Sequence, residues 1–170
     1  MKSYFYLLLC CFAAGIFHSS EMFAQCEIRN KVRPDGSMYF YLAPVSFFRT
    51  VEKQLLGGVL TDNESFYIYL MPKPFPPKPS GSGLKSDLQL KLSNQQTYTL
   101  KHYDSDYLND DTVFRMIYLI DKKDLEDFKN FEVEQVTLNM GTQELNREYN
   151  FKLHRTAIKD ELACLKEKVR

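Results

Sequence analysis

The sequence has no tryptophan, only three histidines and no surplus charge, since 22 basic residues balance 22 acidic ones. A nucleic-acid binder needs a positive surplus to displace counterions from phosphates, so we expect no nucleic-acid partner. The chain also lacks a phosphate-binding loop, a local metal-ligand spacing of His and Cys, and a serine in a nucleophile-elbow motif. No motif therefore names a catalytic residue or a cofactor.

The longest uncharged hydrophobic run, Tyr4 to Phe17, lies close to the amino end. It is shorter than the roughly 20 residues that a membrane-spanning helix needs. Lys2 precedes the run, and Met22-Phe23-Ala24 places a small residue at a possible cleavage site. We interpret 1–24 as a signal peptide and 25–170 as a single exported domain. The domain would reside in the periplasm, on the outer surface or in the medium, without a transmembrane segment.

Four cysteines fall into two classes. Cys10 and Cys11 would leave with the leader, whereas Cys26 and Cys164 remain near the two ends of the mature chain. An even pair of cysteines in an oxidising compartment indicates a disulfide. Because this bond would close a loop of nearly the whole mature chain, the chain-entropy model gives it a stabilisation of about 5 kcal/mol. Two alternatives stay open: a lipid on Cys26, although Gln25 before it is larger than such processing prefers, or two free buried thiols.

The chain is rich in Phe and Tyr, which favour strands. Residues 65–71 carry apolar side chains on both faces, a pattern typical of a central strand covered on both sides. Connections of hairpin length indicate antiparallel pairing. A short helix is expected over 122–130, capped by Asp121, and a second over 156–169.

The fold class that these patterns predict is mainly β (α+β). We expect a single antiparallel β-sandwich or curved sheet of about eight strands, with the C-terminal helix packed on it. A closed barrel with a ligand cavity is the main alternative.

Aromatic side chains supply the candidate binding residues. Phe75 lies in the Pro- and Gly-rich segment 72–83, which is typical of a solvated loop, so its ring would be an exposed anchor. Tyr67 and Tyr69 alternate with apolar residues on the predicted central strand. If they line one sheet face with other tyrosines, they form a platform for a partner protein or a sugar.

The densest acidic segment, 104–111, contains Asp104, Asp106, Asp110 and Asp111 and is expected to form a loop between two strands. Its carboxylates are candidate ligands for a hard cation such as calcium. The EF-hand spacing fails, because no Gly stands at the sixth position and no Glu at the twelfth. Nothing selects this interpretation over a solvated acidic loop.

The Phe23-Ala24-Gln25 leader end, Cys26 directly after it, the run 118–125 and the C-terminal helix with Cys164 resemble small secreted proteins common in Bacteroidota. The resemblance implies an exported location and a β-rich fold with a C-terminal helix, and it implies no activity.

These observations favour a non-enzymatic binding or interaction module. Its partner would be a protein or an envelope component, bound through a sheet face or through 72–83. A small-ligand carrier with a barrel cavity is the first alternative. A hydrolase that uses 104–111 together with His102 is the second.

Overall fold

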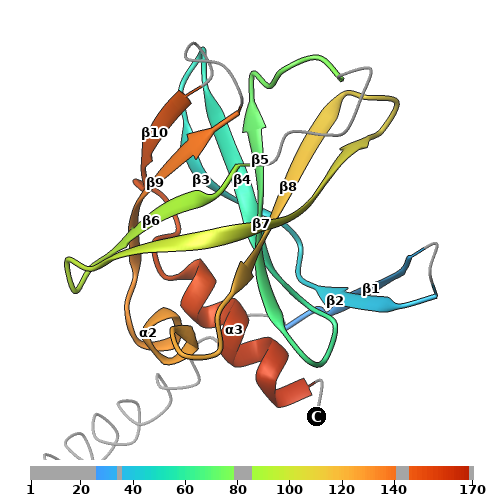
Figure 1. The fold of residues 1–170 in the computed structure, drawn as a ribbon, viewed down its shortest axis with the longest axis vertical. Helices are drawn as coiled ribbons and strands as arrows, with labels where there is room; N and C mark the ends of the chain where they lie inside the picture. Colours follow the sequence, from blue (N-terminus) through green and yellow to red (C-terminus); the bar gives the residue numbers. More distant parts are fainter. Residues whose placement is uncertain (1–25, 34–35, 79–85, 141–145, 169–170) are drawn as a thin grey trace, which may run out of the picture.

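Ten strands form one antiparallel sheet in the computed structural model, which describes residues 26–33, 36–78, 86–140 and 146–168 (Figure 1). The predicted signal peptide lies outside the described residues. The strands are β1 (Arg29–Val32), β2 (Met38–Tyr41), β3 (Val45–Arg49), β4 (Gln54–Thr61), β5 (Phe66–Lys73), β6 (Leu88–Leu92), β7 (Thr97–Leu108), β8 (Val113–Ile120), β9 (Val133–Asn139) and β10 (Asn146–Asn150). The helices are α2 (Leu125–Asn130) and α3 (Ala157–Lys168).

The sheet runs in the order β1-β2-β4-β5-β8-β7-β6-β9-β10, and β3 pairs with β4 beside this path. It curls so far that the carbonyl of Phe47 in β3 accepts hydrogen bonds from the backbone N–H groups of Lys152 and Leu153, at 3.2 and 3.3 Å. The rings of Phe47 and Phe151 stack across the same seam, with centroids 4.2 Å apart. The mainly-β prediction is confirmed in its curved-sheet form, with ten strands where about eight were expected.

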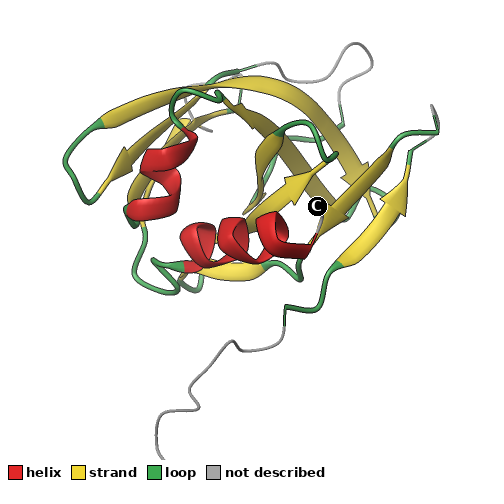
Figure 2. Cartoon of the chain, turned by 90° about the horizontal axis from the view of Figure 1, so that it is seen from below, coloured by secondary structure: helices red, strands yellow, loops and turns green. Residues whose placement is uncertain are grey.

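The inner face of the curled sheet packs against both helices, which lie across its open end (Figure 2). Ile158, Leu162 and Leu165 of α3 are buried there at the predicted helical spacing. The expected cap of α2 is wrong. The residue that precedes the helix is Asp124, and its side chain makes no cap bond. Asp121 lies one turn earlier, where its carbonyl accepts a hydrogen bond from the N–H of Asp124.

The long strand β7 changes partner along its length. Its first four residues, 97–100, pair with β6, and 101–108 pair with β8. The ladder with β8 shifts register between His102 and Asp104, so Tyr103 forms a bulge. The expected acidic loop is therefore wrong in its bounds: Asp104 and Asp106 belong to the strand, since each lies opposite a residue of β8.

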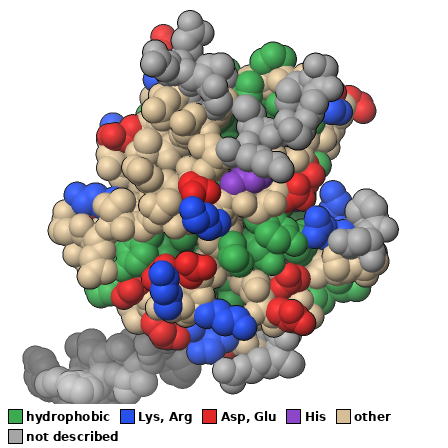
Figure 3. All heavy atoms as spheres, in the orientation of Figure 1, with side chains coloured by type: hydrophobic (Ala, Val, Ile, Leu, Met, Phe, Trp, Pro, Cys, Tyr) green, Lys and Arg blue, Asp and Glu red, His purple; other side chains and the backbone are tan. Residues whose placement is uncertain are grey.

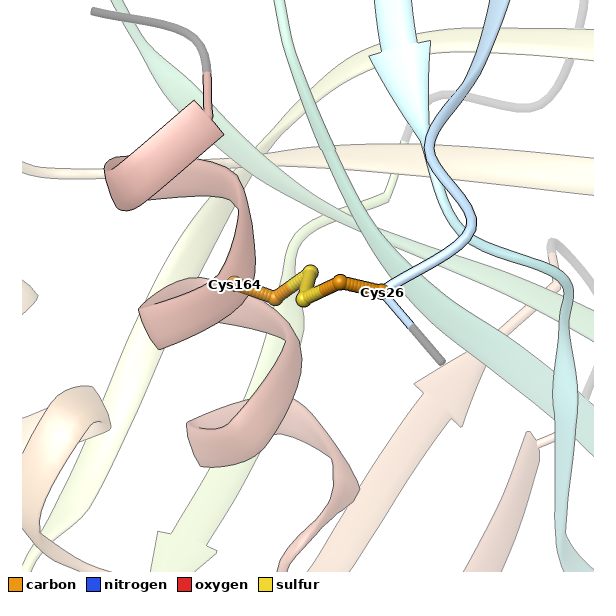
Figure 4. Close-up of a disulfide and its surroundings, with 2 residues drawn as sticks. All are labelled: Cys26 and Cys164. Atoms are coloured by element: carbon orange, nitrogen blue, oxygen red, sulfur yellow. A yellow bond between two sulfur atoms is a disulfide. The ribbon is translucent and has the colours of Figure 1, made fainter. Parts of the chain in front are cut away.

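Cys26, three residues before the start of β1, lies against Cys164 of α3, and their sulfur atoms are in contact (Figure 4). The two Cα atoms are 5.9 Å apart, a separation typical of disulfide-bonded cysteines. The predicted pairing of these residues thus agrees with their Cα separation, and it would join the segment before the first strand to the last helix.

Candidate functional site

The outer face of the sheet carries a second, smaller hydrophobic cluster, which we call the outer cluster. Its buried members are Tyr39, Leu60, Tyr67, Tyr69 and Ile117. The hairpin of β1 and β2 contributes Tyr39 to it, and β2 pairs with β4 only through Phe40 and Tyr41. Beyond these residues the hairpin lies over the sheet, and the ring of Tyr39 meets Tyr67 edge to face at 6.0 Å.

Tyr67 and Tyr69 share the outer face, as a platform would require, yet only 3% and 4% of their surfaces are exposed. The hydroxyl of Tyr67 donates to Asp62 at 2.8 Å, and that of Tyr69 donates to the carbonyl of Leu42 at 3.0 Å. Burial raises the pKa of both hydroxyls, with further contributions from Asp62 and Glu161 respectively. Both side chains are therefore buried under the hairpin and do not form an exposed platform. The exposed ring of this region is Tyr103, at 44%.

Arg33, at the end of β1, fastens the hairpin to β7. Its Nη2 lies 3.2 Å from Asp104 Oδ2, and its Nη1 donates to the Tyr103 hydroxyl at 3.3 Å. The guanidinium also lies over two rings, 5.0 Å from the centroid of Tyr39 and 5.8 Å from that of Tyr103. These contacts combine a charge-assisted bond with cation–π attraction in a half-buried setting. We call this arrangement the Arg33 clamp.

A groove of about 630 Å³ opens beside the Arg33 clamp. This volume falls within the about 300–1,000 Å³ typical of ligand sites. The groove is lined by Lys31, Val32, Arg33, Tyr39, Asp104, Asp106, Tyr107, Leu108 and Arg115. In the same orientation as Figure 1, hydrophobic surface lies next to the hairpin and is flanked by basic and acidic side chains (Figure 3).

The charges of the groove are largely matched to one another. Asp104 pairs with Arg33, and Asp106 pairs with Arg115 through a short contact to its Nη2. Lys31 forms no ion pair with any described residue. The groove therefore contains two ion pairs and, in Lys31, one cation without an ion-pair partner among the described residues. Val32 and Leu108 add apolar side chains to the lining.

The four acidic candidates for cation binding are not brought together. Asp104 and Asp106 are held by arginines, whereas Asp110 and Asp111 lie in the exposed turn after β7, where Asp111 pairs with Lys78 at 3.1 Å. Within the described residues, no three His, Cys, Asp or Glu side chains gather in a metal-binding group. The turn itself places Asn109, Asp110 and Asp111 at positive φ.

His102 lies on the opposite face of the sheet from Asp104. Its ring meets the edge of Tyr118, with centroids 6.0 Å apart, and Tyr118 belongs to the inner core. The bulge at Tyr103 turns the chain so that Asp104 reaches Arg33 on the outer face. The structure thus places His102 on the other face of the sheet from Asp104, the first acidic residue of the segment 104–111 that the hydrolase alternative combines with this histidine.

Phe75 is half-buried, so the expected exposed anchor is wrong. Its ring packs 6.2 Å from Tyr107 and 6.1 Å from Phe114, and it joins the inner core. The hydroxyl of Tyr107 donates to the carbonyl of Pro76 at 3.1 Å and draws the start of the Pro-rich segment against the sheet. The remainder of that segment, from residue 79 onward, lies outside the described residues.

The sequence did not single out Lys31, Arg33 or Arg115 as site residues. A signal was present for the first two, since Arg29, Lys31 and Arg33 alternate along the chain, and alternate residues of a strand share a face. Arg115 interrupts the most apolar strand of the chain, and an isolated charge in such a strand calls for a partner such as Asp106.

No family model, curated protein or solved structure matches this chain. Of the helices that the structure describes, none has the length and apolar character needed to cross a membrane. The function is therefore inferred from the groove itself.

Proposed function

We propose that this protein is an exported, non-enzymatic binding module that holds a segment of a partner protein of the cell envelope in the groove beside its first hairpin. The observation that carries the proposal is the lining of the groove. Lys31, Val32 and Arg33 are consecutive, as are Asp106, Tyr107 and Leu108. Neighbouring residues of a strand point to opposite faces of the sheet, so a groove on one face would contact only every second residue. Three consecutive lining residues therefore indicate that the groove runs along the edge of the strand.

The composition of the groove supports a protein segment as the occupant. Arginine and tyrosine are enriched at the centre of protein interfaces, where apolar contact and a few directed polar bonds combine. The Arg33 clamp and the Arg115–Asp106 pair hold their side chains in place before a partner arrives, and this reduces the entropy lost on binding.

Export is supported by the leader pattern of 1–24 and by the closeness of Cys26 to Cys164. An intact mass of the protein from its own host tests this part. We expect a chain that begins at Gln25 or Cys26 and is two hydrogens lighter than its reduced form. A full-length chain would contradict export, and a lipid mass on Cys26 would contradict the disulfide.

The groove is tested by site-specific photo-crosslinking in the host. A photoreactive phenylalanine analogue replaces Val32, which lines the groove, or in a matched variant Val51, an exposed valine on the turn between β3 and β4. We expect a discrete adduct with one protein from position 32 and none from position 51. The same adducts from both positions, or none from position 32, would overturn the proposal.

A further inference from the structure

We propose that the partner segment binds as an additional β-strand along the free edge of β1, and that its sequence alternates acidic with apolar residues. This inference rests on the proposed function and gives it a partner chemistry. β1 pairs only with β2, at one end of the sheet order, so its other edge has no strand partner among the described residues. All four residues of β1 are exposed.

The backbone groups that face this edge belong to Asn30 and Val32. The N–H of Arg33 donates to the carbonyl of Ser37 at 2.8 Å, so Arg33 and Ser37 are a hydrogen-bonded pair at the turn end of the hairpin. Bonded and non-bonded pairs alternate along an antiparallel ladder, so Lys31 is bonded to its partner Tyr39. The N–H and C=O groups of Asn30 and Val32 then point outward and are available to an incoming strand.

A second unpaired edge lies across the groove. β7 pairs with β6 only through residues 97–100, so the stretch 101–108 has β8 on one side and no described strand on the other. Asp106, Tyr107 and Leu108 of this stretch line the groove opposite Lys31 and Val32. A groove between two strand edges suits an extended chain better than a compact ligand.

The two faces of β1 differ in chemistry. Arg29 and Lys31 lie opposite Tyr41 and Tyr39, which pack on the outer cluster, so both cations face the sheet together with Arg33. Val32 lies opposite Met38 on the other face, and both are exposed, at 58% and 39%. Cross-strand neighbours stabilise a sheet when charges are opposite and when apolar side chains meet. The added strand should therefore place acidic residues toward Lys31 and apolar residues toward Val32.

The same charges argue against a second copy of this chain as the occupant. If two β1 strands paired with each other, Arg29, Lys31 and Arg33 would face the same three cations of the other copy. Like charges directly opposite each other destabilise a strand pair, and cations on an edge strand are a known protection against self-pairing.

The test uses defined peptides with the isotope-labelled mature protein. The first peptide, about eight residues long to match a typical strand, alternates Glu with Val or Thr. The second has Lys in place of Glu, and the third is the Glu peptide with N-methyl groups on the edge that would bond to β1. We expect the first peptide to bind at least about tenfold more tightly than either control and to slow amide exchange at Asn30 and Val32.

Charge-reversal variants separate sequence recognition from general charge attraction. Lys31→Glu should reverse the preference between the Glu and Lys peptides, whereas the matched Lys53→Glu, at an exposed site on the turn between β3 and β4, should leave it unchanged. Equal binding of the Glu and Lys peptides, or binding that leaves Asn30 and Val32 unprotected, would overturn strand addition. If the position-32 adduct survives that result, the groove still binds a protein in another manner; if it is also absent, the proposed function fails as well.

Discussion

A carboxyl oxygen of Glu161 in α3 accepts a hydrogen bond from the backbone N–H of Val59 in β4, at 2.6 Å. The contact fills a gap at the edge of β4. β3 pairs with β4 as far as Gly57, and β2 pairs with it from Leu60 onward, so no described strand accepts the N–H of Val59. A side chain of helix α3 thus satisfies the backbone of β4 at the point where the neighbouring strand changes from β3 to β2.

Glu161→Gln should remove a pH dependence of stability. Burial raises the pKa of Glu161 to about 8, with a further increase from Asp160, whereas the unfolded side chain titrates near 4.3. Between these values the folded protein keeps a proton that the unfolded chain releases, so the wild type should lose stability as the pH rises from about 5 to about 8. The amide of the variant cannot ionise and still offers an oxygen to the N–H of Val59.

Urea unfolding across this pH range measures the effect. We expect the two proteins to be similar near pH 5 and the variant to be more stable by a few kcal/mol above pH 8. Glu167→Gln, on the exposed side of the same helix, is the matched control and should follow the wild type. Parallel curves for wild type and Glu161→Gln would show that the carboxyl ionises in the fold without penalty.

The elements with a strong local pattern could be predicted from sequence. The two-sided apolar pattern of β5 marks it as a central strand, and it lies between β4 and β8. The stripe of α3 and the pairing of Cys26 with Cys164 followed from helical spacing and from an even cysteine count. In each case the decisive interaction is encoded within a few residues or by a rare residue type.

The groove could not be predicted in this way, because its geometry depends on contacts between distant residues. Asp104 has the pattern of a loop residue until Arg33, 71 positions earlier, is placed beside it. The bulge at Tyr103 decides which face Asp104 occupies, and no local signal announces it. Phe75 packs against the rings of Tyr107 and Phe114, more than 30 positions away along the chain, and these contacts leave no trace in the local hydrophobic pattern.

Arg33→Ala should loosen the first hairpin while leaving the rest of the sheet intact. The substitution removes the ion pair with Asp104 and both ring contacts of the Arg33 clamp. We expect amides of β1 and β2 to exchange about tenfold faster, and global stability to fall by about 1 kcal/mol. Lys78→Ala breaks the more exposed pair with Asp111 and should change neither quantity. Unchanged exchange in Arg33→Ala would mean that the outer cluster alone holds the hairpin.

Reduction of the Cys26–Cys164 pair should lower the free energy of unfolding by about 2–5 kcal/mol, because the link closes a loop of sequence separation 138. Thermal unfolding of the mature wild type with and without a thiol reductant measures the loss. The double variant Cys26→Ser, Cys164→Ser should match the reduced wild type and be insensitive to reductant. A wild type that is equally stable in both conditions would show that the thiols are not paired in solution.

Gly57→Ala should destabilise the fold far more than Gly36→Ala. A Cβ on Gly57 would lie 2.4 Å from the backbone oxygen of Tyr69, and this oxygen cannot retreat without breaking the ladder between β4 and β5. We expect a loss on the order of 3 kcal/mol or more. No atom of the described residues lies within 4 Å of a Cβ built on Gly36, and its φ of +85° makes alanine cost about 1 kcal/mol in strain. Urea midpoints of the two variants decide the comparison, and equal midpoints would mean that β4 and β5 are further apart in solution than this packing requires.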